Sequence, residues 1–469
     1  MPPSTVLSAR EPSGVAAPRP ARAQDAPLPA TIGKYRVISR LGDGATSEVF
    51  LARDDFRDAQ VAIKRLRTGW APDSVEGQYS EHFFAAEAAL VGRLQHPNVV
   101  QLLDAVADGP MPYLVMEYVP GETLRRFCRS DNLLPLETIV EIAFKCAMAL
   151  GHCWRQGLIH RDVKPANILA VTRGSEVVDV KITDFGSVLN LGADRTQVFR
   201  VGSLTYMSPE QVDGSELDSR SDIYALGAVM YHLIAGRPPF DANSQPGLLH
   251  QIFHGTPTPL TELREGVSDA LDRLVRSAMA RSREDRPPDW EAFAQQLSRL
   301  VADHEVPRRG AQSVLDSERF SLLRSLEFFA EFGDVELWEV VHRARWARFA
   351  YGDALFRKGE TGNRFHIIAQ GKVEVFRDGR RVAKMGAGTS VGEMAYLAPN
   401  PELRTHSADV LVAAPTTTVS FTPDSLQQLS LGTRSRFDAA FIRVLVRRLH
   451  AAQEALIGQR LGARPPRAG

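Results

Sequence analysis

Two short polar segments limit the folds and functions open to this chain. The first reads His160-Arg161-Asp162-Val163-Lys164-Pro165-Ala166-Asn167, and the second is Asp184-Phe185-Gly186. Together they supply two carboxylates, on Asp162 and Asp184, and one amide oxygen, on Asn167. Phosphoryl transfer needs one carboxylate to orient the attacking hydroxyl. It also needs an amide oxygen and a second carboxylate to hold Mg²⁺ against the phosphates. The two segments therefore predict a phosphoryl-transfer site.

The composition limits the classes of protein to which the chain can belong. Its 469 residues suffice for two or three domains. Lys plus Arg and Asp plus Glu both number 56, and this balance gives no support for a nucleic-acid binder. No apolar run reaches the length of about 18 residues that a transmembrane helix needs. The 3 cysteines fit a reducing compartment, so we expect a cytoplasmic protein without a membrane span.

Changes in composition along the chain predict its division into domains. Residues 1–33 are rich in Pro, Ala and Arg, and such a segment cannot bury enough apolar surface to offset its ordering entropy. We expect a disordered tail there, a first domain over 34–300 and a polar linker over 301–315. A second domain with flanking helices is expected over 316–456, followed by a flexible tail over 457–469.

Glycine turns and short strands characterise the second domain. Regular turn spacing over residues 345–421 predicts a small antiparallel barrel or jelly roll. A helical segment is expected before it, from Asp316 to about Phe332, and another helix after about Ser425. That last helix carries apolar residues at helical spacing and is expected to pack on the barrel: Phe437, Phe441, Leu445 and Leu449. The predicted fold class is α+β multidomain.

The order of the polar segments in residues 34–300 resembles the protein kinase superfamily, and most closely the Ser/Thr kinases of bacteria. The resemblance implies a two-lobed kinase fold that uses ATP and Mg²⁺ and acts on protein substrates. In this family Asp162 would be the catalytic base or would orient the protein hydroxyl, and Lys164 would steady the transferring phosphoryl group. Asn167 and Asp184 would hold Mg²⁺.

The segment Leu41-Gly42-Asp43-Gly44-Ala45-Thr46-Ser47-Glu48-Val49 resembles the glycine-rich loop that covers ATP phosphates, although a serine stands where the family has a third glycine. The residues assigned to ATP here are Leu41, Gly42, Gly44 and Val49. Taken alone, the same pattern is also that of a tight hairpin turn. The following Val61-Ala62-Ile63-Lys64 resembles the strand that carries the ATP-anchoring lysine.

Lys64 requires a carboxylate partner, and the resemblance favours Glu87, with Glu81 as the alternative. The segment Tyr113-Leu114-Val115-Met116-Glu117-Tyr118-Val119 resembles the strand that leads into the kinase hinge. The backbone of Glu117 and Val119 would then meet the adenine edge.

The stretch between Asp184 and Glu210 resembles a kinase activation segment, and its candidate phosphosites are Thr196, the leading one, and Thr205. A phosphate adds almost two negative charges and can order such a loop by pairing with an arginine. The resemblance implies that this arginine is Arg161. Two further matches are structural. Glu210 is expected to pair with Arg286, and Asp222 is expected to brace the backbone of the catalytic loop.

The barrel resembles cyclic nucleotide-binding domains in its Gly371–Val375 strand and in Val391-Gly392-Glu393-Met394-Ala395. In that family Gly392 would lie at the cyclic phosphate and Glu393 would accept a hydrogen bond from the ribose hydroxyl. An arginine pairs with the phosphate. Arg404 is the candidate arginine, while an alternative alignment places His406 at that position. Cyclic AMP and cyclic GMP are both candidate ligands.

Three functions remain open from the sequence. The first is a Ser/Thr protein kinase regulated by the cyclic nucleotide-binding-like domain. The second is a nucleotide-binding pseudokinase scaffold, against which the intact Lys64, Asp162, Asn167 and Asp184 argue. The third is an active kinase whose second domain mediates homodimer formation or another protein interaction.

Overall fold

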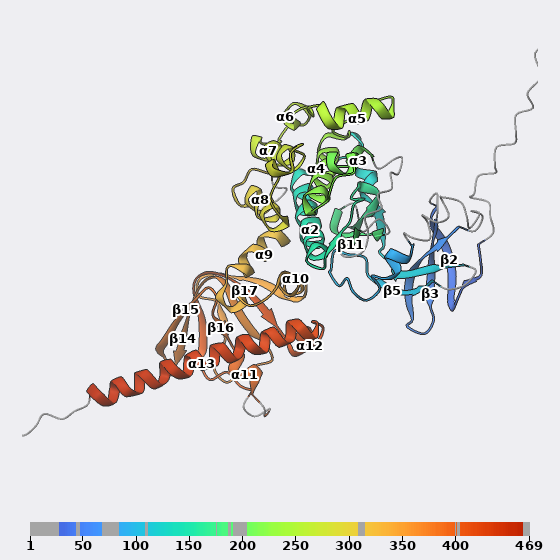
Figure 1. The fold of residues 1–469 in the computed structure, drawn as a ribbon. Coiled ribbons are helices and arrows are strands. Elements are labelled where there is room, and N and C mark those ends of the chain that lie inside the picture. Colours follow the sequence, from blue (N-terminus) through green and yellow to red (C-terminus); the bar gives the residue numbers. More distant parts are fainter. Residues whose placement is uncertain are drawn as a thin grey trace, which may run out of the picture. The chain divides into compact units, whose positions relative to one another are not determined.

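The computed structural model describes residues 28–43, 47–67, 84–107, 111–174, 176–185, 189–190, 204–307, 315–398, 400 and 404–462, with the backbone alone for 189–190 and 455–462. The chain divides into two compact units. Residues up to Glu81 together with Leu103–Tyr118 form the first unit, and His82–Leu102 together with Val119–Gly469 form the second. Each unit is described by itself below, with the element labels of Figure 1.

The first unit is a six-stranded sheet in the order β1-β2-β3-β4-β6-β5. Its strands are β1 (Thr31–Ile32), β2 (Tyr35–Asp43), β3 (Ser47–Asp54), β4 (Ala59–Leu66), β5 (Leu102–Val106) and β6 (Tyr113–Glu117). The central strand β4 buries Val61, Ala62 and Ile63 in succession, as a strand covered on both faces does. Phe50 and Val115 pack against this run and complete the core of the sheet.

The second unit begins with a helical region whose central elements are two buried helices. These helices are α2 (Leu136–Arg155) and α4 (Ser219–Ala235), and both bury side chains around almost their whole circumference. Further helices in the described part of this region include α3 (Pro209–Asp213), α5 (Gln245–His254), α6 (Leu260–Leu263), α7 (Asp269–Ala278) and α8 (Trp290–Ala302). The burial of α2 and α4 gives the short strands and loops between them a fixed support.

Short strands and 3₁₀ turns in this region carry the polar segments found in the sequence. They form a three-stranded sheet β10-β9-β7 and a two-stranded sheet β11-β8. The strands are β7 (Gly121–Thr123), β8 (Leu158–Ile159), β9 (Ile168–Arg173), β10 (Glu176–Ile182) and β11 (Leu189–Asn190). The 3₁₀ turns are η2 (Leu124–Phe127), η3 (Pro165–Asn167), η5 (Leu204–Tyr206) and η6 (Arg283–Asp285).

The carboxy-terminal region is β-rich and is flanked by helices. Its sheet has the path β12-β17-β14-β15, with β13 paired to β17 and β16 paired to β14. The strands are β12 (Arg345–Phe349), β13 (Ala354–Phe356), β14 (Phe365–Arg377), β15 (Arg380–Gly386), β16 (Ser390–Val391) and β17 (Asp409–Phe421). These strands pair antiparallel, and Ile368, Val373 and Val412 lie in the core. The predicted α+β multidomain fold is confirmed.

The helices that flank this sheet differ in part from the sequence expectation. They are α9 (Asp316–Arg324), η7 (Glu327–Phe329), α10 (Asp334–Arg343), α11 (Glu393–Leu397), α12 (Pro423–Gln427) and α13 (Leu431–Gly462). The single helical segment expected over 316–332 is wrong, because α9 ends at Arg324 and the separate helix α10 begins at Asp334. The residues between the two helices turn so that Phe328, Phe329 and Phe332 can pack against Phe437.

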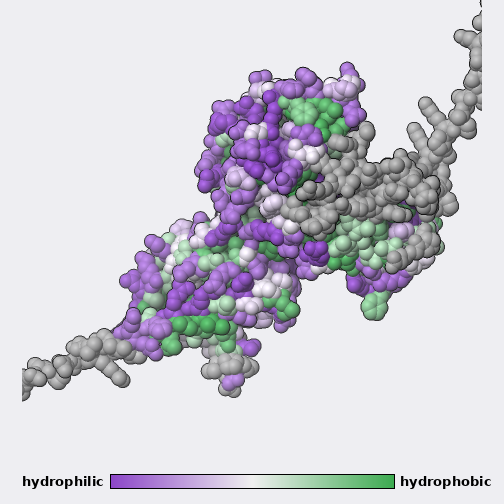
Figure 2. Space-filling view, viewed as in Figure 1, coloured by the Kyte–Doolittle hydropathy of each residue, from purple (hydrophilic) through white to green (hydrophobic). Residues whose placement is uncertain are grey.

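Helix α13 packs as expected through Phe437 and Phe441, but the packing expected of Leu449 is wrong. With 3.6 residues per turn, successive steps of four residues rotate around the helix and bring Leu449 to the exposed side. Phe437 and Phe441 are buried, and Phe365 of the sheet lies 4.9 Å from Phe441 between ring centroids. The outer face exposes Ile442, Val446 and Leu449, and apolar side chains gather along this helix in Figure 2. No helix in the described residues is long and apolar enough to cross a membrane. Homodimer formation stays a prediction.

Candidate active site

The loop after β8 brings two of the predicted site residues, Lys164 and Asn167, to the carboxylate of a third, Asp162. Lys164 donates from Nζ to Oδ2 of Asp162 at 2.7 Å, and Asn167 donates from Nδ2 to the same oxygen at 3.0 Å. Asn167 also donates to the backbone oxygen of Asp162 at 2.9 Å. Because these bonds use the amide nitrogen of Asn167, its amide oxygen points to the other side of the side chain. That arrangement suits a residue expected to hold Mg²⁺ through oxygen.

A buried aspartate near the start of α4 holds the backbone of this loop. Asp222 accepts hydrogen bonds from the backbone N–H of His160 at 2.7 Å and of Arg161 at 2.9 Å. Burial raises the pKa of Asp222, and the two N–H donors counter that rise. Arg161 has a φ of 63°, a conformation that is strained for a residue with a side chain and that these bonds help to maintain. The predicted bracing role of Asp222 is confirmed.

The segment that carries Asp184 is tied to the same loop. Thr183 donates from its backbone N–H to the backbone oxygen of Asn167 at 2.9 Å. The His160 ring Nε2 lies 3.2 Å from the oxygen of Thr183, and its ring centroid lies 4.9 Å from that of the buried Phe185. Asp184, which stands between Thr183 and Phe185, has a φ of 65°. The structure therefore fixes the backbone of Asp184 next to Asn167.

The residues predicted to bind ATP lie side by side on strands of the first unit. Gly42 of β2 is the register partner of Val49 of β3, and Val49 is the partner of Lys64 of β4. Leu41 is exposed beside Gly42 on β2. Glu117, the last residue of β6, is the register partner of Val61 on β4. Gly44 lies outside the described residues.

Two predicted partners of these strands belong to the second unit. Glu87 and Val119 are both buried there. The pairing of Lys64 with Glu87 and the role of Val119 at the adenine edge stay predictions. Of the two candidate phosphosites, Thr205 is half-buried in η5, and Thr196 lies outside the described residues.

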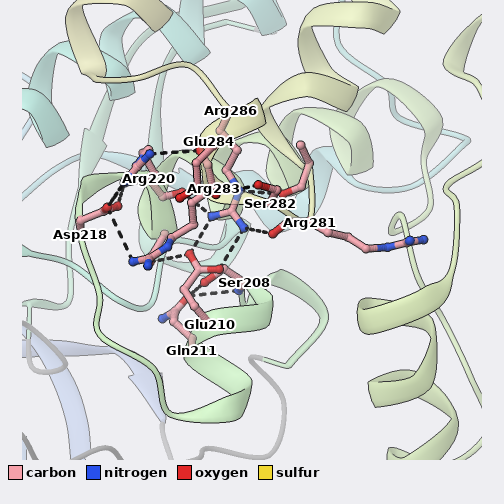
Figure 3. Close-up of polar contacts among 12 residues, drawn as sticks. Ser208, Glu210, Gln211, Asp218, Arg220, Arg281, Ser282, Arg283, Glu284 and Arg286 are labelled. Carbon is pink, nitrogen blue, oxygen red and sulfur yellow. Dashed lines mark hydrogen bonds and ion pairs between the residues drawn. The ribbon is translucent and has the colours of Figure 1, made fainter.

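The end of the activation-like segment is anchored by a buried ion pair (Figure 3). Arg286 donates from Nη1 to Oε1 of Glu210 at 2.6 Å and from Nη2 to Oε2 at 2.9 Å. Ser221 donates its hydroxyl to the same Oε1 at 2.7 Å. Burial opposes ionisation of Glu210, but the Arg286 guanidinium outweighs it, so the net pKa is lowered. The predicted pairing of Glu210 with Arg286 is confirmed.

Gln211 is a structural contributor that the sequence reading did not single out. Its Nε2 donates to the backbone oxygen of Arg161 at 2.9 Å, next to Asp162. Its Oε1 accepts from the backbone N–H of Ser208, which completes a capping box at the start of α3. The pattern Ser208-Pro209-Glu210-Gln211 is a recognisable helix-start signal, but its link to Arg161 depends on tertiary structure.

The predicted ligand residues of the barrel lie at the start of α11 and on a neighbouring loop. Gly392 has a φ of 84°, and a Cβ there would lie 2.6 Å from the Phe356 ring. Glu393 is 1% exposed and accepts a hydrogen bond on Oε1 from Arg448 of α13. Its Oε2 is buried without a hydrogen-bond partner among the described residues.

The two candidate phosphate partners of the barrel differ in position. Arg404 is exposed and donates from Nε to the backbone oxygen of Ala398 at 3.3 Å. His406 is buried and stacks on Phe356 with 3.9 Å between ring centroids, and burial lowers its pKa. Neutral His406 therefore offers no positive charge to a phosphate, and Arg404 remains the candidate.

Comparison with known proteins matches two parts of the chain to domain families. Residues 35–298 match the protein kinase domain, and residues 346–431 match the cyclic nucleotide-binding domain. Serine/threonine-protein kinase PknB of Mycobacterium leprae is 37% identical over 301 residues, which cover 62% of this chain and 46% of that protein. PknB of Mycolicibacterium smegmatis is 36% identical over 299 residues, with the same coverage of 62% and 46%. Serine/threonine-protein kinase pkn3 of Myxococcus xanthus is 35% identical over 294 residues, which cover 60% of this chain and 53% of that protein.

The chain spans about half the length of these curated relatives. The kinase match alone covers more than half of the present chain, and it contains the loop of Asp162 and the segment of Asp184. The chain therefore belongs to the protein kinase family, and a cyclic nucleotide-binding domain follows its kinase domain.

Proposed function

We propose that this protein is a Ser/Thr protein kinase that transfers the γ-phosphoryl group of ATP to protein hydroxyls. The observation that carries the proposal is the cluster of Asp162, Lys164 and Asn167, with the backbone of Asp184 fixed next to it. A pseudokinase scaffold would have no need for a lysine and an amide directed at one buried carboxylate. The relatives, named as serine/threonine-protein kinases, support the same reaction.

In the proposed reaction, the substrate hydroxyl hydrogen-bonds to Asp162. Its oxygen forms the new bond to the γ-phosphorus while the bond to the β-phosphate oxygen breaks and ADP leaves. Asp162 accepts the hydroxyl proton, and Lys164 lies 2.7 Å from its Oδ2, where the ammonium also stabilises charge on the transferring group. Mg²⁺, when bound, neutralises phosphate charge, and Asn167 and Asp184 would hold it.

The first unit would supply the ATP-binding surface in this proposal. Gly42 and Gly44 would let the backbone approach the phosphates, Val49 would line the ATP site beside them, and Lys64 would pair with the phosphates. The backbone of Glu117 and Val119 would bind the adenine edge. Leu41 would cover the base. Phosphorylation of Thr196, with Thr205 as the second candidate, would bring a charge that Arg161 can bind.

Phosphate transfer from radiolabelled ATP tests this proposal directly. Purified full-length protein is expected to incorporate label into itself or into casein with Mg²⁺, and to lose incorporation when EDTA removes the metal. Acid hydrolysis should yield phosphoserine or phosphothreonine, and a phosphosite map should show occupancy at Thr196 or Thr205. Absence of label in both the protein and casein, with ATP still bound, would favour the scaffold.

A second candidate function is the binding of a cyclic nucleotide by the barrel. The observation in its favour is the buried Oε2 of Glu393, which lacks a hydrogen-bond partner among the described residues; the buried hydroxyl of Ser390 also lacks one there. A buried carboxylate oxygen without a donor is costly, and a ribose hydroxyl would supply one. Gly392 would lie at the cyclic phosphate and Arg404 would pair with it.

We expect cyclic AMP or cyclic GMP to bind the wild-type protein in calorimetry, and Glu393→Gln to weaken that binding about tenfold or more, the usual cost of losing a hydrogen bond to a charged group. The matched control is Glu374→Gln, since Glu374 lies on β14 and pairs with Arg381. No binding heat from either nucleotide would leave the barrel as an interaction or dimerisation module.

A further inference from the structure

The helices α9 and α10 precede the barrel in sequence but pack on a helix of the kinase domain. Phe320 of α9 and Trp338 of α10 enclose Phe144 of α2 in a triangle of rings, with centroid separations of 5.9, 5.8 and 5.4 Å. All three side chains are buried. Aromatic rings at such separations contribute to packing beyond their buried area. The helix pair is therefore packed against α2 through these three rings.

The Trp338 indole also reaches a buried asparagine of the kinase domain. Its Nε1–H donates to Oδ1 of Asn98 at 2.5 Å, and both side chains are 0% exposed. Asn98 donates from Nδ2 to Asp179 Oδ1 at 2.9 Å and to the backbone oxygen of Val180 at 2.8 Å. Trp338 thus satisfies the one side-chain acceptor of Asn98, while Asn98 holds the strand β10.

The strand β10 leads directly to the proposed metal ligand. Ile182 at its end donates to the backbone oxygen of Asn98 at 2.8 Å and accepts from the backbone N–H of Val100 at 2.8 Å. The next residue, Thr183, bonds to Asn167, and Asp184 follows. Backbone hydrogen bonds therefore connect Asn98, through Ile182 and Thr183, to Asn167 and to the segment that carries Asp184.

Buried charges add a second connection between α9 and the kinase domain. Lys145 of α2 is 3% exposed, and its Nζ lies 3.1 Å from Asp179 Oδ1 and 3.0 Å from Asp316 Oδ2. Burial opposes the charge on Lys145, but its acidic neighbours outweigh that effect and raise its pKa. Ser317 donates its hydroxyl to Glu141 Oε2 at 2.6 Å. The amino terminus of α9 thus supplies partners that buried groups of α2 require.

Helix α10 is also bonded to α13 and to the residue that precedes α13. Glu339 of α10 accepts from the Thr433 hydroxyl at 2.6 Å and from the Ser430 backbone N–H at 3.1 Å. Arg448, farther along α13, donates to the Glu393 carboxylate and, at 2.7 Å, to the backbone oxygen of Ser390. Contiguous hydrogen bonds and packed rings therefore extend from the barrel site, along α13 and α10, to Asn98.

We propose that the α9–α10 pair is a positioning device through which the second domain sets the rate of phosphoryl transfer, with Trp338 as its positioning residue. The inference rests on the proposed kinase function. A change in the bond between Glu393 of α11 and Arg448 of α13 alters the support of α10, and Trp338 transmits the change to Asn98, β10 and Asp184. Such control requires two arrangements of the helix pair that differ in how they hold Asn98.

The test compares two tryptophans of the full-length chain. Trp338→Phe keeps a ring against Phe144 but removes the donor to Asn98. Trp346→Phe also removes an indole N–H, but one that donates to the Val341 backbone oxygen of α10 at 3.4 Å rather than to Asn98. The kcat for casein phosphorylation is expressed per folded molecule, with the folded fraction taken from circular dichroism. We expect this kcat to fall about tenfold in Trp338→Phe, which corresponds to about 1.4 kcal/mol in the activation free energy. KM for ATP should stay within twofold, and Trp346→Phe should match the wild type.

Equal kcat in wild type and Trp338→Phe, or an equal loss in Trp346→Phe, would overturn the proposal. If Trp338→Phe does not fold, Asp316→Asn decides instead, because it removes a partner of Lys145 and leaves the rings in place. A lower kcat in that variant supports the proposal, and an unchanged one rejects it. No activity in the wild type would instead reject the kinase function on which the inference rests.

A double-variant cycle separates coupling from a local structural role. Arg448→Gln releases Glu393 from α13 and is expected to change kcat in the wild-type background. If Trp338 carries the effect, Arg448→Gln should change kcat much less in the Trp338→Phe background. Additive effects of the two substitutions would show that the second domain acts on the kinase by another route.

Discussion

Replacing Asp162 with asparagine is expected to lower the rate of phosphoryl transfer by about 10²–10⁴-fold, the usual contribution of a positioned base. Asparagine has the same shape but cannot accept the hydroxyl proton, and it removes the anion that Lys164 contacts at 2.7 Å. Initial rates of casein phosphorylation at saturating ATP and excess Mg²⁺ measure the effect. ATP affinity should change little, because the residues proposed to bind ATP lie on other segments of the chain.

The matched control for this variant is Asp131→Asn. Asp131 is an exposed aspartate that pairs with Arg129, so its loss should leave the rate within twofold. A rate for Asp162→Asn within tenfold of the wild type would contradict the assigned role. Loss of ATP binding together with the rate would instead indicate that the substitution disturbs the fold of the loop.

The catalytic loop could be predicted from sequence because its chemistry is local. Asp162, Lys164 and Asn167 lie within one short segment, so their spacing alone brings them together once the chain turns at Pro165. Asp222 and Arg286 are distant in sequence from their partners, and they were predicted only through the family resemblance. Both contacts are present in the structure.

The contacts of α9 and α10 with the kinase domain could not be predicted in this way. Trp338 and Asn98 are separated by 240 residues, and neither has a local pattern that names the other. Asp316 and Ser317 appear in sequence as an ordinary polar helix start, yet they satisfy buried groups of α2. Likewise, the pairing of Glu393 with Arg448 depends on where α13 crosses the sheet, which hydrophobic spacing alone does not determine.

Replacing Arg286 with alanine is expected to destabilise the kinase domain by about 3–5 kcal/mol, since removing one partner leaves a buried charge without compensation. The Arg286 side chain is 0% exposed and, besides Glu210, it donates to the backbone oxygens of Ala280, Arg220 and Arg281. Figure 3 shows these bonds converging on one guanidinium. The free energy of urea unfolding at neutral pH, followed by circular dichroism, measures the loss.

Arg129→Ala serves as the control, because Arg129 and Asp131 are 74% and 65% exposed and such pairs contribute about 1 kcal/mol or less. The pH dependence adds a second check. The pKa of Glu210 is lowered in the folded state, so its stabilisation is fully present above the usual value of 4.5 and is lost as the pH falls through the folded value. The stability difference between wild type and Arg286→Ala should therefore be largest at neutral pH and shrink in acid. A small difference at neutral pH would contradict the expected contribution of Arg286. A difference that stays large in acid would show that the bonds of Arg286 to backbone oxygens, rather than its charge pair with Glu210, carry that contribution.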